Sequence, residues 1–258
     1  TLSLHDALPI FSFSPTGGTQ RAAGILAERL LDAIVPVDLT DGREDFSSIS
    51  LGKGDVAVIA VPSYGGRAPG TAVQRLSVIK GNGASAILVC VYGNRAYEDT
   101  LAELRDTAQS AGFHVICAVA AVAEHSIARQ FAAGRPDSQD QARLTEFAEE
   151  IRKKLTAGDE SEPAIPGSRP YRESHVSRIV PEPSEACVKC GLCAERCPVQ
   201  AIDAQDPRKI DREACISCMR CVAICPHTAR KGSDVRLTAL TAMLNKACRE
   251  RREPELYI

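Results

Sequence analysis

The stretch ACVKCGLCAERCPVQAI, residues 186–202, decides how the C-terminal part of this 258-residue chain folds, and ACISCMRCVAICPHTAR, residues 214–230, repeats it. Both stretches contain the pattern C-x2-C-x2-C-x3-C-P. Every cysteine of the second stretch lies 28 positions after its counterpart in the first. Each copy is too short to form a core of its own, so the two copies are expected to pack together as a pseudo-twofold unit.

This double motif resembles that of bacterial ferredoxins with two [4Fe-4S] clusters. Three thiolates on one tight loop can bind three corners of an iron–sulfur cube, while the fourth thiolate serves the other cluster. The proline after the fourth cysteine favours the turn that sends this ligand away. The expected ligand sets are therefore crossed: Cys187, Cys190, Cys193 and Cys225 for one cluster, and Cys215, Cys218, Cys221 and Cys197 for the other.

Other uses of these cysteines fit the pattern less well. A zinc ribbon uses two separated CxxC pairs rather than two triplets that are each followed by Cys-Pro. A disulfide framework is typical of small secreted chains. A degenerate or [3Fe-4S] site and a zinc site remain the alternatives to two [4Fe-4S] clusters.

Composition restricts the function classes. The formal net charge of −2 gives no basic footprint for nucleic acid. No stretch has the apolar length of a membrane span. Cys90, Cys117 and Cys248 are the cysteines outside the ligand sets. This many free thiols indicates a reducing cytoplasm, and oxygen-sensitive clusters suggest an anaerobe.

The N-terminal peptide TLSLHDALPI has no initiator Met, and it back-translates to a sequence that looks like the end of a common sequencing adapter. We therefore expect residues 1–10 to be an assembly artefact, with an ordinary truncated N-terminus as the alternative. On this interpretation the first strand begins at Phe11, and Ala7–Ile10 are apolar enough to imitate a strand, although Pro9 should weaken it.

The rest of the chain alternates strand and helix patterns. Short or apolar runs predict strands at 11–14, 35–39, 56–61, 86–92 and 113–122, and helical spacing predicts helices after residue 19, at 99–111, at 140–155 and at 234–251. Apolar runs without alternation fit strands that are buried on both faces. This alternation predicts a doubly wound parallel α/β sheet.

The loop between the first predicted strand and helix has the sequence Ser14-Pro-Thr16-Gly17-Gly18-Thr19. Its main-chain N–H groups and hydroxyls could wrap a phosphate at the positive end of the helix. It lacks the GxGxxG motif and the lysine of a Walker loop. It resembles the [ST]-x-T-G-x-T phosphate loop of flavodoxins, which bind FMN. An ordinary helix-start turn is the alternative.

Two further loops follow predicted strands, where open α/β sheets bind ligands. In flavodoxins the matching loops flank the flavin ring, so the resemblance implies flavin contacts from one set: Tyr64, Gly65, Gly66, Tyr92, Gly93, Asn94 and Tyr97. The alternative is that these are ordinary turn glycines and half-buried tyrosines.

Together the motifs resemble the flavodoxin–ferredoxin fusion proteins of anaerobic bacteria and archaea. The resemblance implies a flavodoxin-like FMN-binding domain at 11–157, a linker at 158–180, a small α+β two-[4Fe-4S] ferredoxin domain at 181–232, and a C-terminal helix and tail at 233–258.

The function expected from these cofactors is electron transfer. FMN takes up two electrons and the clusters carry one at a time, so the chain would pass electrons singly to other redox proteins. No catalytic triad or carboxylate pair is visible, and we assign no catalytic residue. The alternative is an FMN- and iron–sulfur-dependent oxidoreductase of a small substrate, with His125 or Arg67 facing the substrate.

Overall fold

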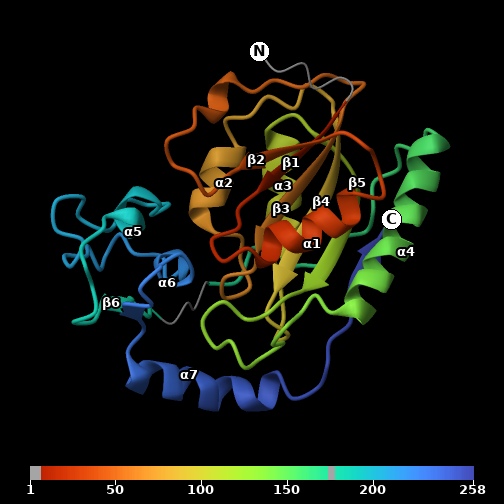
Figure 1. Cartoon of the computed structure of the whole chain (residues 1–258). Coiled ribbons are helices and arrows are strands. Elements are labelled where there is room, and N and C mark those ends of the chain that lie inside the picture. The colour runs from red at the N-terminus through yellow and green to blue at the C-terminus, as the bar shows by residue number, and fades with distance from the viewer. Residues whose placement is uncertain (1–6, 174–177) are drawn as a thin grey trace.

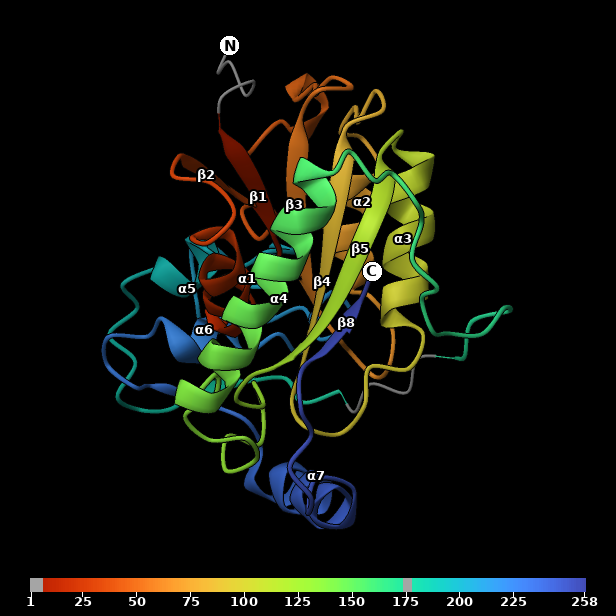
Figure 2. The same cartoon turned by 90° about the vertical axis from the view of Figure 1, so that its right-hand side faces the viewer.

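The computed structural model describes residues 7–173 and 178–258. Its main feature is a six-stranded sheet in the order β2-β1-β3-β4-β5-β8, seen from two sides in Figures 1 and 2. The first five strands are parallel, and β8 joins the edge antiparallel to β5. The strands are β1 Leu8–Ser12, β2 Ile34–Asp38, β3 Val56–Pro62, β4 Ser85–Tyr92, β5 His114–Val122 and β8 Glu255–Tyr257.

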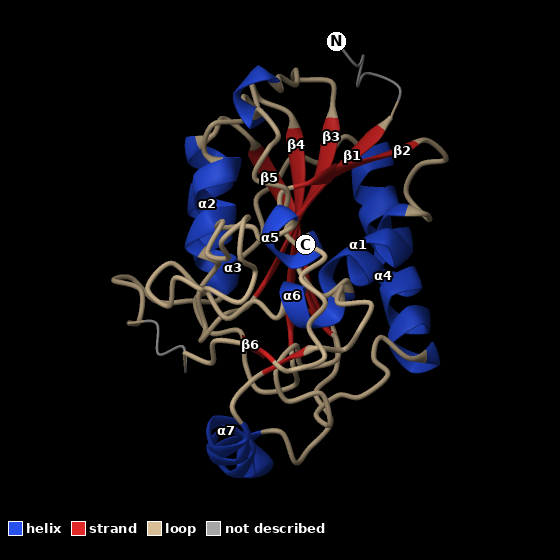
Figure 3. Cartoon of the chain, turned by 60° about the vertical axis from the view of Figure 1, so that its left-hand side comes forward, coloured by secondary structure: helices blue, strands red, loops and turns tan. Residues whose placement is uncertain are grey.

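Helices cover both faces of the sheet, α1 and α4 on one side and α2 and α3 on the other (Figure 3). Each face has its own buried apolar core. The apolar runs of β3, β4 and β5 supply both cores, because successive side chains of a strand point to opposite faces. The bounds are α1 Gly18–Ala27, α2 Gly70–Leu76, α3 Thr100–Ser110 and α4 Ser138–Thr156, with a short 3-10 turn η1 at Phe46–Ser48. A doubly wound sheet with the order 2-1-3-4-5 is the flavodoxin-like arrangement, as expected from the sequence.

Strand β1 begins three residues before the predicted start at Phe11. Leu8, Pro9 and Ile10 are buried and lie in register with β2. The N–H of Leu8 donates to Ala33 of the β2 side at 2.8 Å, so the nitrogen of Pro9 faces β3. Pairing with β3 starts only at Ile10, which is why the missing N–H of Pro9 is tolerated. Residues 1–6 of the expected artefact lie outside the described residues.

The cysteine-rich segment forms a small unit beside the sheet domain, at the left of Figure 1. Its elements are β6 Glu182–Pro183, α5 Leu192–Glu195, α6 Arg220–Ala223 and β7 Arg230–Lys231, with β6 and β7 antiparallel. The two repeats share their backbone turns. Left-handed φ angles occur at equivalent positions in both, at Lys189 and Ser217, at Gly191 and Met219, and at Gln200 and Thr228.

The cysteine-rich unit is docked on the sheet domain through arginines. The guanidinium of Arg75 in α2 donates to Leu39 O at 2.6 Å and to Pro198 O at 2.5 Å, directly after Cys197. Arg220 lies 3.6 Å from the Asp38 carboxylate. Between the two units, part of segment 158–173 runs along α3, where Asp99 accepts from the N–H groups of Ser168 and Arg172 at 2.8 Å.

The C-terminal segment joins both units. Helix α7, Asp234–Ala247, lies below the sheet in Figure 1. The residues after it return to the sheet edge and form β8. Its buried Leu240 and Leu244 share a third apolar core with Ala128 of the sheet domain and Met219 of the cysteine-rich unit. Within the described residues, no helix combines the length and apolar character that crossing a membrane requires.

Candidate functional site

A cavity of about 420 Å³ opens at the carboxyl ends of the parallel strands. Loops that follow β1, β3, β4 and β5 line it, and the cysteine-rich unit and α7 close it. Ligands of doubly wound sheets bind at this end, near the point between β1 and β3 where the strand order reverses. The volume lies in the range of small-molecule sites.

The loop after β1 forms one wall of this cavity. Gly17 has a left-handed φ of 88°, which glycine adopts without strain, and α1 starts at Gly18. The hydroxyl of Ser14 accepts from Gln20 N at 2.9 Å and so fixes the loop, while Thr16, Gly18 and Thr19 line the cavity. A Cβ on Gly18 would come within 3.2 Å of Ala123. A glycine loop at a helix start fits a phosphate group.

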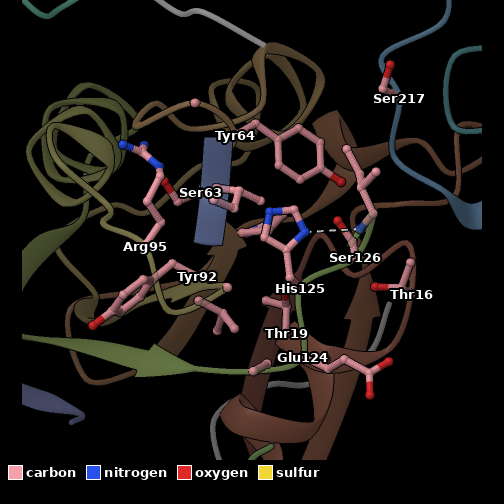
Figure 4. A pocket seen from close by; sticks show the side chains of 18 of the residues that line it. Thr16, Thr19, Ser63, Tyr64, Tyr92, Arg95, Glu124, His125, Ser126 and Ser217 are labelled. Atoms are coloured by element: carbon pink, nitrogen blue, oxygen red, sulfur yellow. Dashed lines mark hydrogen bonds between the residues drawn. The ribbon is translucent and has the colours of Figure 1, made fainter. Parts of the chain in front are cut away.

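The loop after β3 contributes an aromatic side chain. Tyr64 and Gly65 line the cavity, and Tyr64 points across it in Figure 4. Burial raises the pKa of Tyr64 well above its usual value, and the Cys218 side chain adds to this rise. The Tyr64 hydroxyl therefore stays protonated and lies near the cysteine-rich unit. Gly66 lies outside the cavity, where a Cβ would contact Glu98.

Residues at the end of β4 and in the loop after it contact either the cavity or the C-terminal segment. Tyr92 and Gly93 line the cavity, but Figure 4 shows the Tyr92 ring directed away from His125. That ring packs against Tyr97, with 5.2 Å between centroids. Tyr97 and Asn94 lie outside the cavity and bind the C-terminal segment, Tyr97 through a 2.6 Å hydrogen bond to the Tyr257 hydroxyl.

His125 follows β5 and faces the cavity (Figure 4). Its Nδ1 lies 3.2 Å from Ile127 N and 3.1 Å from Ala128 N and accepts from both, so the neutral ring carries its proton on Nε2. Burial, with a smaller effect of the Arg95 charge, lowers the pKa of His125 to about 4. A Cβ on Gly93 would lie 2.6 Å from the His125 ring, so glycine is required for this close packing. Arg67, the other side chain considered as substrate-facing, is paired with Glu103 at 2.7 Å.

Several lining residues had no local signal in the sequence. Arg95, Arg172, Ile216 and Ser217 reach the cavity, as do four residues of α7: Leu240, Met243, Leu244 and Ala247. The helix pattern of α7 was visible, but nothing in its sequence indicated that it covers the strand ends. These contacts depend on packing between distant parts of the chain.

The eight motif cysteines surround two smaller cavities. Cys197, Cys215, Cys218 and Cys221 line one of them. Cys187, Cys190, Cys193 and Cys225 line the other. Each cavity thus receives three thiols from one repeat and one from the other. Within the residues described, no three His, Cys, Asp or Glu side chains converge closely enough to hold a single metal ion.

In both repeats the fourth cysteine accepts a hydrogen bond from the main-chain N–H at an equivalent position. Ala201 N donates to Cys197 Sγ and Ala229 N to Cys225 Sγ, each at 3.3 Å. Burial raises the pKa of Cys218 and of Cys221 to about 12. Such thiols bind metal as thiolates, so metal binding releases protons. Four thiols around a small cavity whose other lining residues are mostly apolar are the donor set of a [4Fe-4S] cluster.

One side chain joins the large cavity to a thiol cavity. Ile216, between Cys215 and Ser217, lines both the 420 Å³ cavity and that of Cys197, Cys215, Cys218 and Cys221. It also packs against the core on the α2 and α3 face of the sheet. Among the described residues, the other thiol cavity has no lining residue in common with the large cavity, and its Cys190 is exposed.

Comparisons with known proteins show what the parts of the chain are similar to. Residues 186–229 match the family model described as a 4Fe-4S dicluster domain. None of the curated proteins compared matches the chain. Among solved structures, rubredoxin oxygen:oxidoreductase from Desulfovibrio gigas is similar at 16% identity and a TM-score of 0.43, over 59% of this chain and 36% of that protein.

Two flavodoxins are similar over most of their own length. The flavodoxin of Streptococcus pneumonia TIGR4 is 24% identical with a TM-score of 0.39, over 57% of this chain and 98% of that protein. The Fusobacterium nucleatum flavodoxin bound to flavin mononucleotide is 16% identical with a TM-score of 0.41, over the same shares. The strand order and the family match together define the class: a flavodoxin-like domain fused to a 4Fe-4S dicluster domain.

Proposed function

We propose that this chain is an electron-transfer protein that binds FMN and two [4Fe-4S] clusters and exchanges electrons singly with other redox proteins of a reducing cytoplasm. The observation that carries the proposal is the position of Ile216, which lines both the large cavity and one thiol cavity. An electron can therefore pass between a ligand of the large cavity and a cluster across a single layer of side chains.

FMN is the flavin that we assign to the large cavity, because a glycine loop at a helix start lines it and can hold a phosphate. The Ser14–Thr19 loop would hold its phosphate through main-chain N–H groups and the Thr16 hydroxyl. Tyr64, Gly65 and Gly93 would border the ring, and the Nε2 proton of His125 is available to a flavin acceptor atom. Bound FMN supplies two-electron chemistry, and the clusters supply one-electron steps.

The two clusters would have different places in the path. The cluster held by Cys197, Cys215, Cys218 and Cys221 is the inner one, because Ile216 lines both its cavity and the large cavity. The cluster held by Cys187, Cys190, Cys193 and Cys225 is the outer one, and the exposed Cys190 places it near the surface. Redox partners would exchange electrons with the outer cluster.

The test is anaerobic purification with flavin, iron and sulfide analysis, followed by rapid reduction of the flavin with light. We expect about one FMN, about eight iron and about eight sulfide per chain. Cys218→Ala should slow electron transfer from flavin to the remaining cluster at least about tenfold, an increase of about 1.4 kcal/mol in the barrier. Cys190→Ala should leave transfer from flavin to the inner cluster unchanged.

Two results would contradict the proposal. One is the absence of flavin or of iron–sulfur absorbance in the reconstituted parent. The other is equal slowing by the two cysteine substitutions. Oxidation of the reduced protein by a small substrate, without any redox protein, would instead favour the oxidoreductase.

A further inference from the structure

Arg230 lies between the two thiol cavities and lines both of them. It is 3% exposed and belongs to β7. One terminal nitrogen donates to Pro181 O at 3.3 Å and the other donates to Pro207 O. Its Nε is buried and has no hydrogen-bond partner within the described residues. A buried polar group without a partner costs free energy, so this nitrogen indicates a missing acceptor.

The internal repeat shows that a charge at this position is specific to the second copy. Arg230 lies 28 positions after Ile202, which holds the equivalent place in the first copy. Ile202 is also buried, and it lines only the cavity of Cys197, Cys215, Cys218 and Cys221. The second copy has thus replaced a buried apolar side chain with a guanidinium that reaches both cavities.

A buried guanidinium requires negative charge nearby, since burying an isolated ion is very unfavourable. Within the described part of the chain, Arg230 forms no ion pair with a carboxylate, and its hydrogen-bond partners are the two proline carbonyl oxygens. The thiols that line the same two cavities lose their protons when they bind metal and would supply negative charge beside it. Bound clusters would therefore compensate the burial of Arg230.

We propose that Arg230 is a positioning residue that the two clusters share. Its positive charge stabilises the reduced forms of both clusters and raises both midpoint potentials. The inference rests on the proposed function, because it needs both clusters. Reduction adds one negative charge to a cluster, and a nearby cation in a low-dielectric site favours that charge. Hydrogen bonds and charge around the sulfurs are recognised determinants of cluster potential.

The test is an anaerobic redox titration of the full-length, cluster-loaded protein, followed by electron paramagnetic resonance. We compare the parent with Arg230→Lys, Arg230→Gln and Arg230→Met. In the two neutral variants the ratio of reduced to oxidised cluster at the parent midpoint should fall about tenfold for each cluster, which is about 59 mV for a one-electron couple. Arg230→Lys should stay near the parent.

Arg212→Met is the matched control, because Arg212 is exposed and pairs with Glu182. It should leave both potentials unchanged. Arg230→Gln keeps hydrogen-bond donors and serves if Arg230→Met does not fold. Unchanged midpoint potentials in a neutral variant that retains both clusters would overturn the role of Arg230. A shift in the potential of one cluster alone would show that Arg230 does not act on both clusters. If the parent itself formed no clusters, the proposed function would fail instead.

Discussion

The side-chain amide of Asn94 donates to the main-chain oxygen of Cys248 at 3.1 Å and thereby ties the loop after β4 to the end of α7. The same amide nitrogen also donates to Glu250 O at 2.9 Å, and the amide oxygen accepts from Arg252 N at 2.9 Å. Asn94 is 5% exposed. One side chain thus holds three main-chain groups of the segment that returns from α7 to β8.

Asn94→Ala should loosen the C-terminal segment. It leaves buried main-chain groups without partners, and we expect a loss of about 3 kcal/mol in the free energy of unfolding. FMN should also dissociate faster, because α7 lines the cavity. Urea unfolding, flavin release and limited proteolysis after residue 248 would measure these effects. Asn245→Ala changes an exposed residue of α7 and should leave all three unchanged.

Pairs of cysteine substitutions test the crossed ligand sets. Cys197→Ala and Cys218→Ala should each lose one cluster, and the double variant should still contain about four iron atoms because both thiols line the same cavity. Cys197→Ala combined with Cys190→Ala should lose nearly all iron, since these thiols line different cavities. If each repeat instead held its own cluster, the two double variants would show the reverse iron contents.

Local spacing was sufficient to predict part of this molecule. The thiols and the Ser14–Thr19 loop are recognisable from short segments, and in the structure Thr16 and Gly18 line the cavity. Asn94 and Tyr97 both follow β4 and were predicted to contact a flavin. They instead bind residues 248–257, because β8 occupies the free edge of β5. That edge contact joins residues more than 130 positions apart, and no local pattern encodes it.

The burial of Arg230 is a second feature that could not be predicted from the sequence alone. The repeat was recognised by its cysteines, and a comparison of Ile202 with Arg230 was already possible in the sequence. The sequence alone could not show that the side chain would be buried between two cavities. Arginine is usually exposed, so its burial was not expected.

Thr16 allows a test of phosphate binding. Thr16→Ala removes a hydroxyl donor from the loop and should weaken FMN about tenfold, or about 1.4 kcal/mol, while riboflavin, which has no phosphate, should bind as before. Thr16→Ser keeps the hydroxyl and should retain parent affinity. Flavin fluorescence titration measures both ligands. An equal loss for FMN and riboflavin would show that the substitution disturbs the loop rather than the phosphate contact.

His125 should make stability depend on pH. Its folded pKa of about 4 lies below the usual value of about 6.5, so unfolding takes up a proton as the pH falls. The stabilisation is complete above about pH 6.5 and is lost as the pH approaches 4; we expect a loss of about 2 kcal/mol between pH 7.5 and pH 5. His125→Asn keeps an acceptor for the loop N–H groups and should reduce that loss, as measured by anaerobic urea unfolding.

His227→Asn is the control for this measurement, because His227 is exposed. It should follow the parent at every pH. A parent and a His125→Asn variant with the same pH dependence would mean that His125 is protonated in the folded protein near its ordinary pKa.

Two prolines in neighbouring strands test the hydrogen bonding of β1. The nitrogen of Pro9 faces β3, since Leu8 N donates towards β2 and Phe13 N donates to Ala60 O of β3 at 3.0 Å. The same alternation places the missing N–H of Pro9 opposite the main-chain oxygen of Val56. Pro9→Val restores the donor and should raise the free energy of unfolding by about 1 kcal/mol. FMN occupancy should rise with it, because β1 leads into the Ser14–Thr19 loop.

Pro36 in β2 is the matched control. Leu39 N donates to Ser12 O at 2.9 Å, so the nitrogens of Val35 and Val37 also face β1, whereas that of Pro36 faces away from the sheet. Because a proline on the outer side of an edge strand removes no ladder hydrogen bond, Pro36→Val should gain nothing. Thermal melts and flavin titrations of the two variants check this. If Pro9→Val were no more stable than Pro36→Val, the start of β1 would not depend on a hydrogen bond to β3, and its apolar burial alone would hold Leu8–Ile10 in the sheet.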